Sequence, residues 1–171
     1  MNVEIRRLHP GDDALVMHVA DEVFDEPVRP DRLAAYLASP GHFMIVAIAD
    51  EIVVAQCAAV IHRHPDKVSE LYIDEVGVTP AFQRQGIARK MLDAMFEIGR
   101  EYGCEEAWVG TEPDNGPARA LYESRKEPRG KAEEFVMYVY RLSRLDEAPR
   151  LRHPRAEQGA KRRAKTLGSM P

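Results

Sequence analysis

The sequence predicts an α/β (α+β) fold with one mixed central sheet and flanking helices. Short apolar runs of strand length alternate with segments whose apolar residues recur at helical spacing. The predicted order of elements is β–α–α–β–β–β–α–β–α–β, which is typical of helices packed on a single sheet. A chain of 171 residues with 44% hydrophobic residues is long and apolar enough to bury one such core.

The N-terminal part predicts one strand and two helices. Val3–Arg7 alternates apolar and charged residues, as in a half-exposed strand. Asp12 or Asp13 can cap a helix, and the apolar residues that follow at helical spacing are Leu15, Val16, Val19, Ala20 and Val23. Prolines end this helix before Asp31. Asp31 can cap a second helix, whose apolar face contains Leu33, Ala34, Tyr36 and Leu37.

The central part predicts three strands and the longest helix. Phe43–Ala49 and Ile52–Ile61 flank Asp50-Glu51, so we expect a hairpin with a two-residue connection. A polar loop leads to a third strand, Glu70–Val78. The helix that follows carries an apolar stripe of Ile87, Met91, Leu92, Met95, Phe96 and Ile98.

The C-terminal part predicts two more strands around a helix. Ala107–Gly110 is a short strand, and Pro117 begins a helix because proline is favoured in the first turn. Phe135–Tyr140 predicts the final strand. The pattern then stops, so we expect a folded domain over residues 1–143 and a basic, disordered tail over 144–171.

Charge and composition limit the classes of function. The tail holds eight Lys/Arg against three Asp/Glu, whereas the preceding residues hold 16 against 25. An acidic body can attract a polycationic substrate, although it is also an ordinary solvated surface. The basic tail could touch nucleic acid or membrane, with simple disorder as the preferred interpretation. It lacks interleaved aromatic residues and no apolar run is long enough to span a bilayer, so we expect no nucleic-acid partner and no membrane partner. Two cysteines make no disulfide framework and the N-terminus shows no secretory signal, so we expect a cytoplasmic protein.

One strand–turn–helix carries the features of an anion site. The strand ends at Val76-Gly77-Val78, and the next helix begins near Gly86. Backbone N–H groups in the first turn of a helix lack partners and point toward an anion, which the helix dipole also favours. Gly86 and Ala88 leave room for a phosphate, and Arg84 adds positive charge. An ordinary loop with one glycine is the alternative.

Three motifs together are specific. Gln83-Arg84-Gln85-Gly86-Ile87-Ala88 resembles the Gln/Arg-x-x-Gly-x-Gly/Ala motif of the GNAT superfamily of N-acetyltransferases. Val76–Pro80 resembles that family's fourth strand, and Asn115–Glu123 is similar to its Asn-x-x-Ala-x-x-Leu-Tyr-Glu element. The resemblance covers roughly residues 3–142 and implies a GNAT fold and an enzyme that uses acetyl-CoA to acetylate a primary amine.

The resemblance also implies residue roles. The backbone of Val76, Gly77 and Val78 would bind the acetyl carbonyl and the pantetheine arm of acetyl-CoA. The residues that would hold the pyrophosphate are Gln83, Arg84, Gln85, Gly86, Ile87 and Ala88. Asn115 would contact the pantetheine, and Tyr122 would protonate the departing thiolate. A core tyrosine is the alternative for Tyr122. Family members are often dimers, so a homodimer is a candidate assembly.

The general base is open among the acidic residues of one strand. Strict alternation puts Glu70, Tyr72 and Asp74 on one face and Glu75 on the other. GNAT strands commonly bulge here, which can re-aim a side chain. Glu75 directly precedes the carbonyl-binding segment and is the preferred base. The others are expected to bind substrate, and solvated charges are the alternative.

Similarity to one subgroup points to the acceptor. Ser69–Val76 resembles the matching strand of the type I aminoglycoside 3-N-acetyltransferases, and the loop with Asp25 and Glu26 has an acidic counterpart there. Acidic residues suit a polyamine-like substrate. Ser124–Pro128 replaces the usual Gly-Phe turn, so the acceptor site can differ. Another small amine, a protein amine, or a non-catalytic acetyl-CoA-binding module are the alternatives.

We expect no metal site. The histidines do not stand at metal-ligand spacing with cysteine, and His62 and His64 near Asp66 are expected in a solvated turn.

Overall fold

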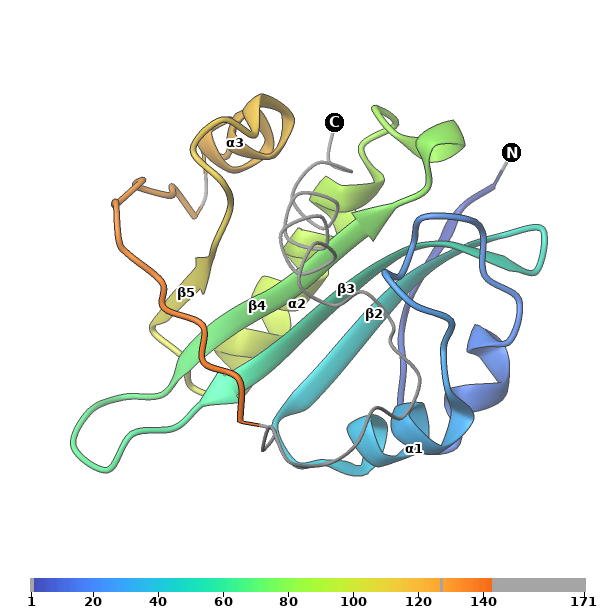
Figure 1. Cartoon of the computed structure of the whole chain (residues 1–171), viewed down its shortest axis with the longest axis horizontal. Helices are drawn as coiled ribbons and strands as arrows, with labels where there is room; N and C mark the ends of the chain where they lie inside the picture. The colour runs from blue at the N-terminus through green and yellow to red at the C-terminus, as the bar shows by residue number, and fades with distance from the viewer. Residues whose placement is uncertain (1, 127, 143–171) are drawn as a thin grey trace.

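One mixed five-stranded sheet organises the protein (Figure 1). The computed structural model describes residues 2–126 and 128–142. The strands lie in chain order, and the first four are antiparallel while the fifth runs parallel to the fourth. Their bounds are β1 Glu4–Arg7, β2 His42–Ala49, β3 Ile52–His62, β4 Glu70–Val78 and β5 Glu106–Val109. The predicted fold class is confirmed.

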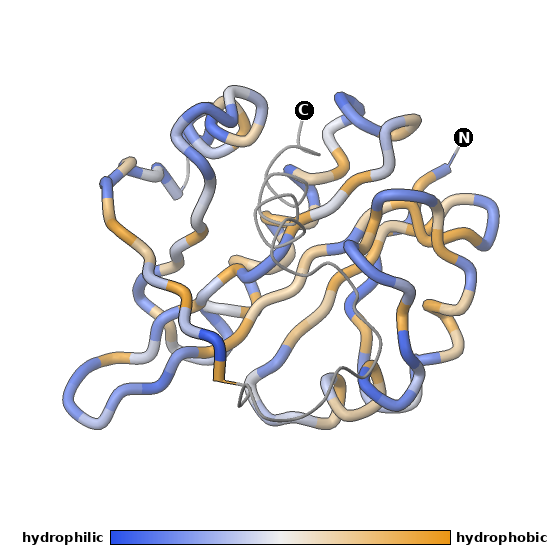
Figure 2. Tube along the Cα trace, viewed as in Figure 1, coloured by the Kyte–Doolittle hydropathy of each residue, from blue (hydrophilic) through white to orange (hydrophobic). Residues whose placement is uncertain are grey.

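Helices cover both faces of this sheet. The α-helices are α1 Pro30–Ala38, α2 Ile87–Glu101 and α3 Gly116–Glu123, and the 3₁₀ helices are η1 Asp12–Val16 and η2 Pro80–Phe82. The apolar stripe of α2 packs with alternate residues of β2, β3 and β4 in one buried cluster. A second cluster joins α1 and η1 to the opposite face. Figure 2 shows the hydrophobic residues concentrated along the central strands.

The β2–β3 hairpin forms as predicted. Asp50 and Glu51 connect the strands with φ angles of 48° and 64°. Two consecutive left-handed residues are what a tight hairpin turn of matching twist requires. Among the described residues, no helix is long and apolar enough to span a bilayer. Cys57 and Cys104 are free thiols, as expected.

The first predicted helix is wrong beyond its first turn. Only η1 forms, and the chain then runs alongside the start of β3. The amide of Ala20 donates to the Val53 carbonyl, and the amide of Val53 donates to the His18 carbonyl, both at 2.9 Å. These bonds to a distant strand replace the helical bonds that the apolar spacing predicted. The second helix is confirmed, although Arg29 rather than Asp31 occupies its N-cap.

The predicted final strand is also wrong within the described chain. Phe135–Tyr140 has no regular secondary structure, and its apolar side chains are 54–79% exposed. A strand needs a neighbour for its backbone hydrogen bonds, and this segment pairs with none of the described strands. The predicted tail, 144–171, lies outside the described residues.

Candidate active site

The candidate active site lies where β4 and β5 stop pairing and diverge. The two strands pair from Glu70–Glu106 to Ile73–Val109, and β5 then ends. Figure 1 shows the chain after β5 turning away toward α3 while β4 continues. Asp74–Val78 therefore has no strand partner on this side within the described residues. An open strand edge can offer backbone donors and acceptors to an extended ligand, and the binding of acetyl-CoA by Val76, Gly77 and Val78 stays a prediction.

The N-terminus of α2 lies directly beyond this edge. Gly86 is its N-cap with φ of 78°, and no side chain caps the first turn. Nothing approaches within 4 Å of the position that a Cβ on Gly86 would take. The first turn contains no acidic residue, so a phosphate meets unopposed N–H groups there.

Two amide side chains shape the turn before α2. Gln83 Nε2 donates to the Val78 carbonyl, and Gln85 Nε2 donates to the Ala81 carbonyl, each at 3.1 Å. Arg84 lies between them in a left-handed conformation with φ of 60°. Arg84, Gln85 and Gly86 are exposed, whereas Ile87 and Ala88 are buried in the core. Ile87 and Ala88 thus face the core with their side chains and can offer only their backbone to a ligand.

Asn115 joins α3 to the same opening. Its Oδ1 accepts a hydrogen bond from the Ala118 amide at 3.1 Å and so caps α3. Its Nδ2 is buried and has no hydrogen-bond partner among the described residues. A buried amide donor of this kind is costly unless a ligand carbonyl accepts from it. The residues present therefore fit an amide-containing pantetheine arm.

Tyr122 lies two helical turns after Asn115, on the same face of α3. It packs against the core cluster that contains Cys57. Burial, with a smaller effect of Cys57, raises the pKa of the Tyr122 phenol above its usual range. A phenol of ordinary pKa already keeps its proton at neutral pH, and burial strengthens this, so the hydroxyl can act as a donor.

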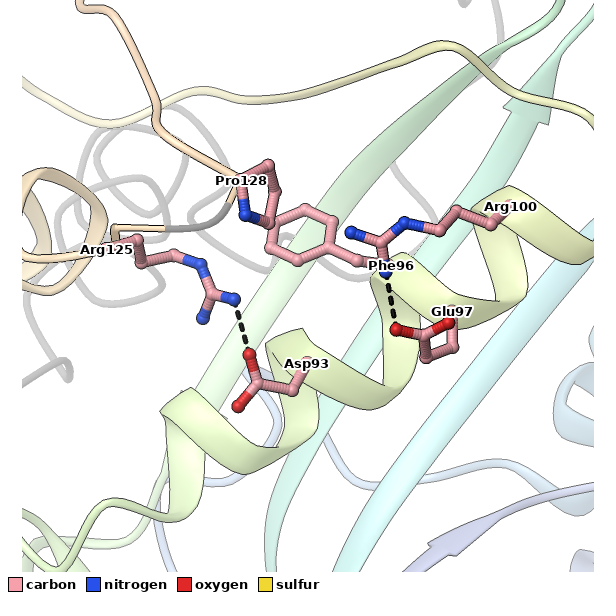
Figure 3. A pocket seen from close by; sticks show the side chains of 6 residues that line it. All are labelled: Asp93, Phe96, Glu97, Arg100, Arg125 and Pro128. Carbon is pink, nitrogen blue, oxygen red and sulfur yellow. Dashed lines mark hydrogen bonds and ion pairs between the residues drawn. The ribbon is translucent and has the colours of Figure 1, made fainter.

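The end of α3 is anchored on α2. Arg125 forms an ion pair with Asp93, and its guanidinium lies 4.8 Å from the centre of the Phe96 ring. Figure 3 shows these side chains lining a pocket on α2, together with Glu97 and Arg100. This pocket contains none of the predicted site residues. Its contacts hold the C-terminal turn of α3, and with it Tyr122, in place.

A bulge in β4 turns the Glu75 side chain to the face of the sheet opposite to the one that strict alternation predicts. Ala58 pairs with Glu75 but Ala59 pairs with Ile73, so Asp74 is an extra residue. Leu71 and Ile73 before the bulge, and Val76 and Val78 after it, all enter the α2 cluster. Glu75 therefore shares the opposite face with Tyr72 instead of facing α2 with Leu71.

Tyr36 of α1 joins the acidic residues on this face. Its hydroxyl lies 3.0 Å from the Phe43 carbonyl and 3.2 Å from the Ala59 carbonyl. Burial, then the charge of Asp74 and more weakly that of Glu75, raises the pKa of Tyr36. Tyr36 was missed in the sequence, where it was simply part of an apolar helix face.

The remaining predicted substrate residues are spread out. Asp25 is half-buried and Glu26 exposed in the loop before α1, where Glu26 and Tyr36 line one hollow. Tyr72 packs against Trp108, with ring centres 4.4 Å apart. Glu70 lies at the far end of β4, roughly 16 Å from Glu75 at about 3.3 Å per residue. Asp74 and Glu75 are consecutive residues at the bulge, and Glu70 lies apart from both.

Gln56 is a second residue that sequence reasoning missed. It is fully buried in β3 opposite Gly77, and neither of its amide atoms has a hydrogen-bond partner among the described residues. A lone amide inside the apolar run Ile52–Ile61 was the available signal. Its position behind the open edge of β4 makes it a candidate polar group of the site.

The chain belongs to the acetyltransferase (GNAT) family, whose model matches residues 13–126. The protein is therefore an acetyl-CoA-dependent N-acetyltransferase, and acetyl-CoA is its cosubstrate. This family membership agrees with the opening beside β4 and the helix N-terminus that follows it.

Particular relatives are similar at low identity. The aminoglycoside N(6′)-acetyltransferase type 1 of Salmonella typhimurium (strain LT2) is 27% identical over 126 residues, covering 70% of this chain and 77% of that protein. A soil metagenomic aminoglycoside acetyltransferase, meta-AAC0020, solved with sisomicin, has a TM-score of 0.71 at 21% identity, covering 82% of this chain and 97% of that one. The ribosomal-protein-alanine N-acetyltransferase of Brucella melitensis biovar Abortus 2308 has a TM-score of 0.62 at 17% identity, covering 83% and 100%.

Proposed function

We propose that the protein acetylates a primary amine of an aminoglycoside. The observation that carries this proposal is the pair of acidic residues Asp74 and Glu75, which the β4 bulge places beside the open edge of that strand. Glu26, in the loop before α1, lines a hollow beside Tyr36 that Arg29 and Arg32 also line. Carboxylates so arranged favour a substrate with several ammonium groups. The Salmonella relative, named for the aminoglycoside 6′-amine, supports the same substrate class.

Each residue has a definite task in this proposal. The backbone of Val76 and Val78 holds the acetyl donor, whose thioester supplies the acetyl group. Glu75 removes a proton from the substrate ammonium, since an amine with a pKa of about 10 is mostly protonated at neutral pH. Backbone N–H groups at the open edge stabilise the oxyanion of the tetrahedral intermediate. Tyr122 supplies a proton to the departing thiolate.

The regiochemistry is a separate part of the proposal. The motif on β4 resembles 3-N enzymes, whereas the Salmonella relative is named for the 6′-amine. We favour a 2-deoxystreptamine aminoglycoside, and product mapping distinguishes acetylation of its 3-amine from acetylation of its 6′-amine. A small polyamine or a protein N-terminus is the alternative acceptor.

A thiol-release assay with an amine panel tests the proposal. The panel contains kanamycin, gentamicin, spermidine and an alanine-initiated peptide, each with acetyl-CoA, and product mapping assigns the amine. We expect turnover with the aminoglycosides, weakened by salt because the acidic face attracts the polycation. Turnover only with spermidine or the peptide would reject the aminoglycoside. Binding of acetyl-CoA without turnover on any amine would reject catalysis.

Two variants with matched controls test Tyr122 as the proton donor and Glu75 as the general base. Tyr122→Phe should lower kcat about 10²-fold with little change in acetyl-CoA affinity, whereas Tyr102→Phe at an exposed position should leave both unchanged. Glu75→Gln should lower kcat/KM, and activity should recover as pH rises and the free amine forms. Glu51→Gln in the hairpin is its control. Equal losses of rate and acetyl-CoA affinity would make Tyr122 a structural residue.

A homodimer belongs to the same proposal. Phe135–Tyr140 presents six consecutive apolar residues to solvent, more than a monomer ordinarily exposes in one segment. A second copy would bury them and provide the missing strand neighbour. Light scattering should give twice the chain mass, and Val136→Glu should give a monomer while Val68→Glu, exposed elsewhere, should not. Cytoplasmic location, where acetyl-CoA is made available, completes the proposal.

A further inference from the structure

Three side chains of types that can ligate a metal meet at the β3–β4 turn, away from the proposed acetyl-transfer site. His62 ends β3, His64 follows in the loop, and Glu70 begins β4. Each offers one ligand atom, and these atoms all lie within 4.8 Å of one another. Among the described residues, this is the one such group of three.

The fold explains why these residues meet. His62 and Glu70 are directly paired across the β3–β4 ladder, which brings cross-strand side chains to about 5 Å. His64 is two residues after His62, so it projects to the same side if the chain continues in extended form. The rings of His62 and His64 have centres 4.4 Å apart. The expectation of a solvated turn is wrong for His64, whose side chain is only 18% exposed.

The donor set suits a transition metal. Two imidazoles and one carboxylate make the N, N, O combination that Zn²⁺ binds, with bonds of about 2.0–2.2 Å and a fourth position for water. Atoms at two corners of such a tetrahedron are roughly 3.4 Å apart. His64 Nε2 already lies 3.2 Å from Glu70 Oε2. Small side-chain rotations thus convert the cluster into a coordination site.

A residue outside the cluster, Lys67, fixes the orientation of the Glu70 carboxylate. Lys67 Nζ donates to Glu70 Oε1 at 2.6 Å, which leaves Oε2 directed at the histidine. Metal-ligating carboxylates are commonly hydrogen-bonded through their other oxygen in this way. Because Lys67 already restricts the Glu70 side chain, metal binding would cost less side-chain conformational entropy.

We propose that His62, His64 and Glu70 bind one divalent transition-metal ion, with Zn²⁺ as the preferred ion. The metal joins the end of β3 to the start of β4 and stabilises the seven-residue connection, 63–69, as a clip. The site lies roughly 16 Å along β4 from Glu75 and is independent of the proposed acceptor.

Calorimetry with Zn²⁺ on the tag-free, chelator-treated full chain tests the site. We expect one Zn²⁺ per chain and a higher Tm, because binding favours the folded state. His64→Ala and Glu70→Gln should each weaken binding at least tenfold without changing the metal-free Tm by more than about 2 °C. His9→Ala is the matched control, since His9 lies near Asp12 on an exposed loop.

The fluorescence of Trp108 can show whether the ion binds at this cluster. Trp108 is the single tryptophan, and its ring centre is 6.2 Å from that of His62. Ni²⁺ or Cu²⁺ should therefore quench its fluorescence at one equivalent in the wild type and not in His64→Ala. Absence of binding at 1 mM Zn²⁺, or equal binding by the two ligand variants and the wild type, would overturn the proposal. Loss of binding in His9→Ala would equally overturn it.

Discussion

Gly77→Ala tests the packing behind the acetyl-CoA edge. A Cβ at Gly77 would lie 2.4 Å from the Val23 carbonyl oxygen, whereas ordinary contacts are 3.4–4 Å. The backbone of β4 or of the Val23 loop must therefore move by about 1 Å, and neither can rotate away as a side chain does. Overpacking costs about 1–3 kcal/mol, and we expect the upper end of this range.

The assays are urea unfolding and acetyl-CoA calorimetry. In thermal unfolding, a loss of about 3 kcal/mol would appear as a Tm decrease of roughly 6–12 °C for a chain of this size. Acetyl-CoA affinity should also fall, because the displaced residue lies between Val76 and Val78. Gly116→Ala is the control, since nothing lies within 4 Å of its Cβ position. A Gly77→Ala protein within about 0.5 kcal/mol of wild type would refute this reasoning.

Three other predictions use matched comparisons. Asn115→Ala should cost about 1 kcal/mol of folding stability through loss of the α3 cap, whereas Asn115→Asp should keep the cap and lose acetyl-CoA affinity; calorimetry and urea unfolding distinguish them. Burial raises the pKa of the Cys57 thiol from 9.0 to about 12. The unfolded thiol ionises first, so the stability of the wild type relative to Cys57→Ala should be constant below pH 9 and fall by about 1.4 kcal/mol per pH unit above it. A pH-independent difference in urea unfolding would contradict this. Arg125→Met should cost about 1–3 kcal/mol by removing the ion pair with Asp93, and a urea midpoint equal to that of the wild type would argue against the α3 anchor.

Local patterns in the sequence predicted most of the scaffold. The alternation in β2 and β3, the stripe of α2 and the turn at Asp50-Glu51 depend on neighbouring residues, so each was visible in a short window. The turn at Gly86 was visible for the same reason, since a glycine before a helix supplies a left-handed N-cap. The roles proposed for Tyr122 and Glu75 remain predictions.

The residues that sequence reasoning misplaced depend on distant partners. Val19 and Ala20 have helical spacing, but their segment bonds to Val53 instead. Phe135–Tyr140 has a strand pattern but pairs with no strand of the described chain. Spacing alone does not encode the choice between a local hydrogen bond and a distant one, because that choice depends on which strand is within reach.

The sequence by itself determined the central elements from β2 to α3, the glycine turn before α2 and the presence of acidic residues on β4. Only the tertiary structure decided how these residues face. One extra residue, Asp74, rotates Glu75 to the side of Tyr72, and cross-strand pairing brings Glu70 to His62. Strand register is set by backbone hydrogen bonds between segments, and a shift of one residue reverses every side chain beyond it.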